Sequence, residues 1–180
     1  VPDEPSVLAE TVEDQLVRAD VLITTGGLSI GRGDAVEDVL TPLGPVRFDA
    51  VAMTPGRRLG VGTVESTPIF CLPGDPVSAQ IAFETFVRPA VRQIAGRREL
   101  HRSCLPASIS TGWHSPPEKR EFVPVRLTGS PSRGYTAEPT SPPGTTRLLG
   151  LARANAIAIV PETTCTVVAG DVLRCLLLDA

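Results

Sequence analysis

The chain has 180 residues, of which 42% are hydrophobic and 21% charged, and its formal net charge is −3 at pH 7. This composition predicts one or two globular domains and excludes a chain that is disordered throughout. The net negative charge argues against a nucleic acid partner. No apolar run approaches the roughly 18–20 residues of a membrane-spanning helix, and the N-terminal segment has no basic, apolar leader, so we expect neither membrane insertion nor export.

The four cysteines show no metal-site spacing, because no CxxC pair and no neighbouring pair of histidines accompanies them. Cys71, Cys104, Cys165 and Cys175 stand among apolar residues. We therefore expect buried, reduced thiols and a cytoplasmic location.

The first half of the chain is predicted to alternate helices and strands. A helix begins at Pro5-Ser6, with Ser6 as its N-cap, and stops at Ala19-Asp20. Residues 21–25 form a continuous apolar run that ends in Gly26-Gly27, which is typical of a strand buried on both faces.

Further elements follow the same alternation. Residues 35–43 are predicted to form a helix, residues 46–53 and 68–72 strands, and residues 77–95 a long amphipathic helix with a kink at Pro89. The apolar stripe of the long helix consists of Ile81, Phe83, Val87, Val91 and Ile94. Helices and strands in alternation predict an α/β fold.

The second half has a different pattern. Four short alternating segments lie between turn-rich pieces, at residues 122–127, 135–138, 156–160 and 172–178. This spacing predicts a small all-β barrel or sandwich. We place the α/β domain at residues 1–97 and the β domain at residues 98–180.

The loop after the first predicted strand is rich in glycine, which lets backbone N–H groups surround anionic oxygens. Thr25 and Ser29 add hydroxyl groups. Asp34, at its end, is either the N-cap of the next helix or a group that holds a cation. The loop lacks both the GK[ST] of a Walker loop and the GxGxxG of a dinucleotide site.

Two more turns follow strands. Residues 72–78 are either a rigid strand-to-helix turn or the second wall of a ligand cleft, with Gly74 allowing close backbone approach. Arg57 and Arg58 end a third turn, and such a pair either binds an oxyanion or is simply solvated.

Taken in order, these motifs resemble the molybdopterin molybdenumtransferase family, to which the enzymatic part of gephyrin belongs. The motifs are residues 20–34, Met53-x-Pro55-Gly56, residues 72–78, Phe86-Val87-Arg88-Pro89, Thr145-Thr146-Arg147-Leu148-Leu149 and Ala154-Asn155-Ala156. The resemblance implies an incomplete three-layer αβα molybdopterin-binding domain followed by a small β-barrel domain.

The resemblance also implies a reaction, a cofactor and an assembly. Adenylylated molybdopterin and molybdate would give the molybdenum-loaded cofactor and AMP, with Mg²⁺ assisting, in a homodimer. Asp34 and Arg57 would be catalytic, with Asp34 holding the metal. The pterin nucleotide would be bound by Thr25, Gly26, Gly27, Ser29, Gly31, Pro73, Gly74, Asp75 and Ser78, and molybdate by Arg57, Arg120, Thr145 and Thr146, at a site between the two domains.

The chain departs from the family pattern at several positions. Where the family has lysine-Pro-Gly-lysine-Pro, this chain has Thr54, Arg57 and Arg58 at the two lysines and the second proline. Asp75 replaces the asparagine of LPGNP, and an added carboxylate beside a bound dianion lowers affinity unless a cation compensates. Family members are about twice as long, so we expect this chain to be the C-terminal part of a longer protein with one open sheet edge.

Other classes remain as alternatives. A pterin adenylyltransferase and the competence-damage-inducible family share the α/β domain, although the β-barrel segment argues against both. A binding or scaffold module would hold the pterin without turnover, and Thr54 and Asp75 favour it.

Overall fold

The computed structural model describes residues 4–28, 35–145 and 147–178, and it divides into two compact units. The first unit comprises Val1–Val51 and Gly56–Gly96, and the second comprises Ala52–Pro55 and Arg97–Ala180. The first is a mixed α/β unit and the second is a β-barrel, as the sequence predicts.

A four-stranded sheet in the order β1-β5-β4-β2 forms the centre of the α/β unit. Its strands are β1 (Leu22–Thr25), β2 (Val46–Ala50), β4 (Arg58–Val64) and β5 (Thr67–Leu72). β1 runs parallel to β5, and the other neighbours are antiparallel.

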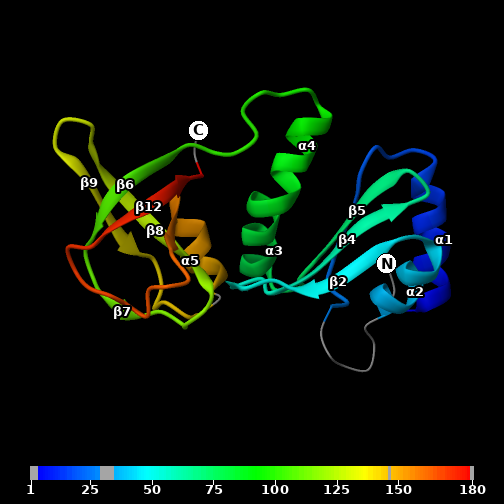
Figure 1. Ribbon diagram of the computed structural model, residues 1–180, viewed down its shortest axis with the longest axis horizontal. Coiled ribbons are helices and arrows are strands. Elements are labelled where there is room, and N and C mark those ends of the chain that lie inside the picture. The colour runs from blue at the N-terminus through cyan, green and yellow to red at the C-terminus, as the bar shows by residue number, and fades with distance from the viewer. Residues whose placement is uncertain (1–3, 29–34, 146, 179–180) are drawn as a thin grey trace. The chain divides into compact units, whose positions relative to one another are not determined.

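Helices cover both faces of this sheet (Figure 1). They are α1 (Pro5–Leu16) and α2 (Ala35–Leu43) on one face, and α3 (Pro76–Ala82), the π-helical η1 (Phe83–Val87) and α4 (Arg88–Ile94) on the other. Strand β5 contributes to both cores because its side chains alternate: Ile69 packs with the α1 and α2 side and Phe70 with the η1 side.

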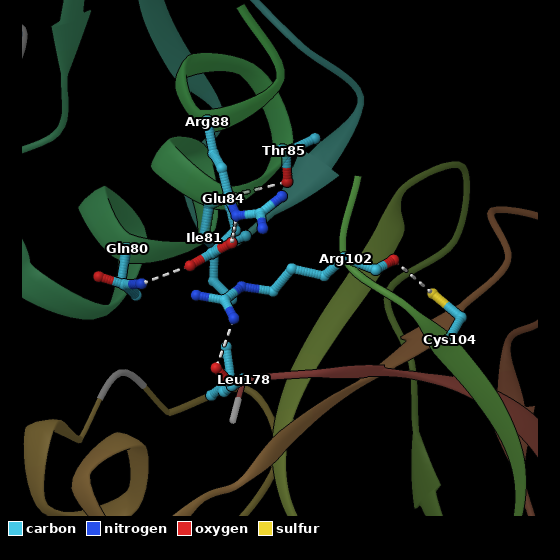
Figure 2. Close-up of polar contacts among 8 residues, drawn as sticks. All are labelled: Gln80, Ile81, Glu84, Thr85, Arg88, Arg102, Cys104 and Leu178. Carbon is cyan, nitrogen blue, oxygen red and sulfur yellow. Dashed lines mark hydrogen bonds and ion pairs between the residues drawn. The ribbon is translucent and has the colours of Figure 1, made fainter. Parts of the chain in front are cut away.

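The predicted irregularity of the long helix is a π-helical turn just before Pro89. The Arg88 N–H donates to the Phe83 carbonyl, so Pro89 falls in the first turn of α4, where its missing N–H leaves no helical bond unmade. At this turn the Gln80 amide donates to buried Glu84 at 3.1 Å, and Arg88 Nε lies 3.7 Å from the same carboxylate (Figure 2).

Three expectations for the α/β unit are wrong. Ser6 lies inside α1, where Glu4 is the N-cap, and its hydroxyl donates to the Glu4 carboxylate. The strand at residues 21–25 is not buried on both faces: β1 is an edge strand, and Ile23 is 43% exposed. The buried stripe of the long helix ends at Val87, because α4 extends beyond the core.

The second unit is a barrel closed by the pairing of β10 with β8. Its strands are β6 (Cys104–Ile109), β8 (Arg120–Ser130), β9 (Gly134–Pro139), β10 (Ala156–Val160) and β12 (Val172–Leu177). The short β3 (Met53–Thr54) joins β8 in parallel, and β7 (Trp113–His114) pairs with β11 (Thr166–Val167).

The barrel interior follows the two-residue period of its strands. Val123, Val125 and Leu127 of β8 point into one core together with Ala156 and Ala158 of β10. Where residues 97–103 approach β6, the Arg102 guanidinium donates to the Leu178 carbonyl after β12 (Figure 2). One helix of the barrel unit, α5 (Leu148–Arg153), was not predicted.

All four cysteines are free thiols, as expected, but only two are buried. Cys71 and Cys175 lie in the cores, whereas Cys104 is half-buried and Cys165 is exposed. Burial raises the pKa of Cys71, and burial, with a smaller effect of Cys104, raises the pKa of Cys175 to about 11. Within the described ranges no helix is both long and apolar enough to span a bilayer.

Candidate functional site

The loops that follow β1 and β5 lie side by side. The two strands are parallel, with Thr25 beside Leu72, so both chains leave the sheet at the same edge. The Gly26 N–H donates to the Leu72 carbonyl at 3.0 Å, which extends the pairing into the first loop. This edge is where α/β folds place ligands.

Glycine is required where the two loops touch. A Cβ on Gly74 would lie 3.2 Å from the Gly26 Cα, closer than most side-chain contacts. Gly26 and Gly27 have φ of 87° and 66°, values that residues with a side chain rarely adopt. The backbones therefore approach each other directly, and their polar groups are not hidden by side chains.

Asp75 caps the helix that follows the second loop. Its carboxylate oxygen Oδ2 accepts from the Ser78 N–H at 2.8 Å and from the Ser78 hydroxyl at 2.6 Å. This is an N-cap at the positive end of α3, which stabilises the negative charge. The serine hydroxyl is buried and is already used as a donor to Asp75.

The third turn brings two arginines to the same edge. Gly56 is buried with φ of 92°, Arg57 is exposed, and Arg58 begins β4. The Arg58 guanidinium forms an ion pair with Glu37, in the first turn of α2. No carboxylate of a described residue forms an ion pair with Arg57.

These three turns surround a cavity of about 450 Å³. The predicted residues that line it are Gly26, Gly27, Arg57, Pro73, Gly74, Asp75 and Ser78. Leu28, Gly56 and Arg58 line it as well. Exposed backbone, a helix N-terminus and two guanidinium groups are the features that bind oxyanions in proteins.

Several predicted residues are not part of this lining. Thr25 is exposed and is not among the residues around the cavity. Ser29, Gly31, Asp34 and Thr146 lie outside the described residues.

Two residues predicted to bind molybdate belong to the barrel unit and have partners there. Arg120 donates to Glu162 Oε2 from Nε at 3.1 Å and from Nη2 at 3.0 Å. A backbone hydrogen bond at Glu162, and then the Arg120 guanidinium, lower the pKa of the Glu162 carboxyl. The Thr145 hydroxyl donates to the Pro142 carbonyl at 2.6 Å.

Arg58 is the charged residue of the described lining that the sequence interpretation did not assign to the site. The sequence predicted Arg57 and Arg58 as a pair that either binds an oxyanion or is solvated, but only Arg57 was assigned to the site, and the following strand β4 was not predicted. Apolar residues recur between Leu59 and Val64, which is a pattern typical of a strand. Gly60 and Gly62 interrupt this pattern, because glycine is uncommon within strands. A Cβ on Gly62 would lie 2.2 Å from the Pro45 carbonyl oxygen, so the close approach of the segment that leads into β2 requires this glycine.

Comparison with known proteins matches two families. The probable molybdopterin binding domain matches residues 1–93, and the MoeA C-terminal region, domain IV, matches residues 106–178. Molybdopterin molybdenumtransferase 2 of Mycobacterium tuberculosis is 35% identical over 178 residues, which are 96% of this chain and 43% of that protein.

More distant relatives also match nearly the whole chain. Gephyrin of Dictyostelium discoideum is 27% identical over 201 aligned residues, covering 99% of this chain and 28% of that protein. The structure of a molybdopterin biosynthesis moeA protein from Pyrococcus horikoshii matches with a TM-score of 0.81 at 25% identity, over 99% of this chain and 42% of that one. The chain thus spans less than half the length of these relatives.

Proposed function

Because the chain belongs to the molybdopterin molybdenumtransferase family of molybdenum cofactor biosynthesis, we propose that it takes part in inserting molybdate into adenylylated molybdopterin with release of AMP. One observation carries this proposal: the Gly26 and Gly74 backbones meet at a cavity that Arg57 also lines. The site suits a ligand with phosphate groups.

The chemistry requires the phosphoanhydride between the pterin phosphate and AMP to break. Negative charge then grows on the departing phosphate. Backbone N–H groups of the paired loops would donate to its oxygens, and the Arg57 guanidinium would stabilise the added charge. Because the loops are fixed by strand pairing and by the Asp75 cap, their donors need little rearrangement as the bond breaks.

Magnesium fits this donor set. Among the described residues no cluster of three or more His, Cys, Asp and Glu side chains forms a metal cage. Mg²⁺ commonly uses only one or two carboxylates together with phosphate oxygens. Asp34, and the Asp75 oxygen that does not accept from Ser78, would hold the ion, which would neutralise phosphoryl charge when bound.

That molybdate is bound by Arg120, Thr145 and Thr146 is still a prediction. The homodimer and the cytoplasmic location are also still predictions. For Arg120 to bind molybdate it must share its guanidinium with Glu162 or leave that carboxylate. The exposed ion pair offers little resistance, since such pairs contribute about 0–1 kcal/mol.

The test is AMP release from adenylylated molybdopterin with molybdate and Mg²⁺. We expect Asp34→Ala to abolish Mg²⁺-dependent release in a chain that keeps its circular dichroism spectrum. If Asp34→Ala unfolds the chain instead, the carboxylate is mainly a cap. We expect Arg57→Ala to weaken molybdate binding, and unchanged affinity would remove Arg57 from the site.

A second candidate is a module that binds the pterin nucleotide without turnover. It is favoured by the hydrogen bonds that already engage Arg120 and Thr145 in the barrel unit. Saturable nucleotide binding with no AMP release would support this candidate. A pterin adenylyltransferase is disfavoured, because residues 106–178 match the MoeA C-terminal region.

A further inference from the structure

We infer that Arg58 is an additional oxyanion-binding residue of this chain, with Glu37 as the group that positions it. The inference rests on the proposed function and adds to it a residue that the family resemblance does not supply, since the family has proline at this position. Its ligand is a tetrahedral oxyanion, either the phosphate of the nucleotide or molybdate.

The burial of one atom carries the inference. Arg58 Nε is fully buried and has no hydrogen-bond partner among the residues that the structure describes. A buried donor without an acceptor is costly, and the Arg58 side chain as a whole is 38% exposed, so a rotation of the guanidinium toward an oxyanion in the cavity would give Nε an acceptor. Arg58 lines the cavity that Gly26 and Gly74 also line.

Glu37 fixes the direction of the side chain. Its carboxylate pairs with Arg58 Nη2, so this ion pair does not use the Nε–H. Glu37 lies in the first turn of α2, and Arg58 is the first residue of β4. The pair therefore holds the arginine at the edge of the sheet, where the ligand loops emerge.

Charge supports the same assignment. Among the described residues, the charged side chains that line the cavity are Arg57, Arg58 and Asp75. Asp75 repels an oxyanion, and Thr54 stands where the family has a lysine. A second guanidinium restores one of the two units of positive charge that these two positions remove, and it binds tetrahedral oxyanions through directed N–H groups.

The experiment measures the affinity of the full chain for AMP and, separately, for sodium molybdate by equilibrium dialysis. The variants are Arg58→Gln, Glu37→Gln, Arg57→Gln and the control Arg47→Gln. Arg47 lies on the same sheet, pairs with Asp49 at 3.2 Å and is 84% exposed, so its loss reports only a change in net charge. Thermal unfolding of each variant is recorded in parallel.

We expect Arg58→Gln to weaken at least one probe about tenfold, which is typical of losing a hydrogen bond from a charged donor. Glu37→Gln should weaken the same probe by less than Arg58→Gln does, because the guanidinium stays but loses the carboxylate that holds it in place. Arg47→Gln should change it less than twofold. Weakening of AMP alone identifies the phosphate as the ligand, and weakening of molybdate alone identifies molybdate.

Other outcomes overturn the inference. If Arg58→Gln and Glu37→Gln lower the melting temperature equally and neither changes affinity, Arg58 has only a structural role. If Arg57→Gln weakens binding and Arg58→Gln does not, the proposed site stands without Arg58. If neither Arg57→Gln nor Arg58→Gln changes the affinity for either probe, or the unaltered chain binds neither probe, the site and the inference both fail.

Discussion

The polar groups of the two units of this chain differ in the partners that they contact. In the α/β unit, polar backbone and two guanidinium groups surround a cavity, and Arg58 Nε has no partner. In the barrel unit, Arg120 pairs with Glu162, Trp113 donates to buried Glu121 at 2.8 Å, and Asn155 bonds to Leu127 twice. On the proposal above, the first unit uses these polar groups to bind a ligand, whereas these side chains of the second fix its own strands. The contrast is not complete, because among the described residues the buried Ser115 Oγ of the barrel unit also has no partner.

The largest effect should come from the barrel. Asn155 Oδ1 accepts from the Leu127 N–H at 2.7 Å, and its Nδ2 donates to the Leu127 carbonyl at 3.0 Å. Asn155→Ala leaves both backbone groups without partners and should cost about 2–3 kcal/mol of unfolding free energy. Urea denaturation measures this. AMP affinity should be unchanged, and a matched loss of affinity would contradict the division of roles.

Next in size is the contact between the two loops. Gly74→Val should separate the Gly26 and Gly74 backbones and weaken AMP binding at least tenfold, about 1.4 kcal/mol. Gly74→Ala should do less, because its Cβ meets Gly26 at 3.2 Å, a distance that a small shift relieves. Dialysis with AMP distinguishes the two. Equal affinity for the unaltered chain and the valine variant would show that the cavity is not the binding site.

A smaller effect is expected at Asp75. Asp75→Asn keeps an acceptor for the Ser78 N–H but removes a negative charge from the cavity, so affinity for AMP without Mg²⁺ should rise by a factor of about two to five. With Mg²⁺ present, the proposed role of Asp75 in holding the ion predicts a fall in affinity instead. Asp75→Ala loses the cap and should also cost about 1 kcal/mol of stability. A fall in affinity for the asparagine variant would indicate that the carboxylate binds the ligand through a cation.

The last stability prediction concerns the barrel thiols, and its effect appears only above pH 9. Because burial raises the pKa of Cys175 to about 11, the folded chain holds this proton more tightly than the unfolded chain does. The resulting stability is complete below the ordinary pKa of 9.0 and should be lost as pH rises through about 11. The urea midpoint, measured at several pH values across that range, reports this loss of stability, and Cys175→Ala should make the midpoint depend less on pH.

Of the four cysteines, Cys165, which is exposed, should react first with iodoacetamide.

The sequence predicted the elements whose pattern is local. Helix α2 and strand β10 have the predicted bounds, since a 3.6-residue or two-residue period identifies each. Strand β4 was missed because its glycines have low β propensity. They are present because they let the neighbouring strand β2 approach closely. The exposure of Ile23 was also missed, because an apolar run does not reveal that its strand lies at a sheet edge.

The candidate site was predicted to a similar degree. The turns around Gly26, Arg57 and Gly74 could be found because they follow strands, and parallel pairing brings two of them together. The partners of the charged side chains could not be found. Glu37 and Arg58 are separated by 21 positions, and Arg120 and Glu162 by 42, and no local pattern encodes such pairs.

The most direct test of the account is a crystal structure of the chain with AMP. We predict that the phosphate lies against the Gly26 and Gly74 loops, within hydrogen-bonding distance of Arg57. A phosphate bound instead at Arg120 and Thr145, with the loop cavity empty, would contradict the assignment of the oxyanion site to the α/β unit.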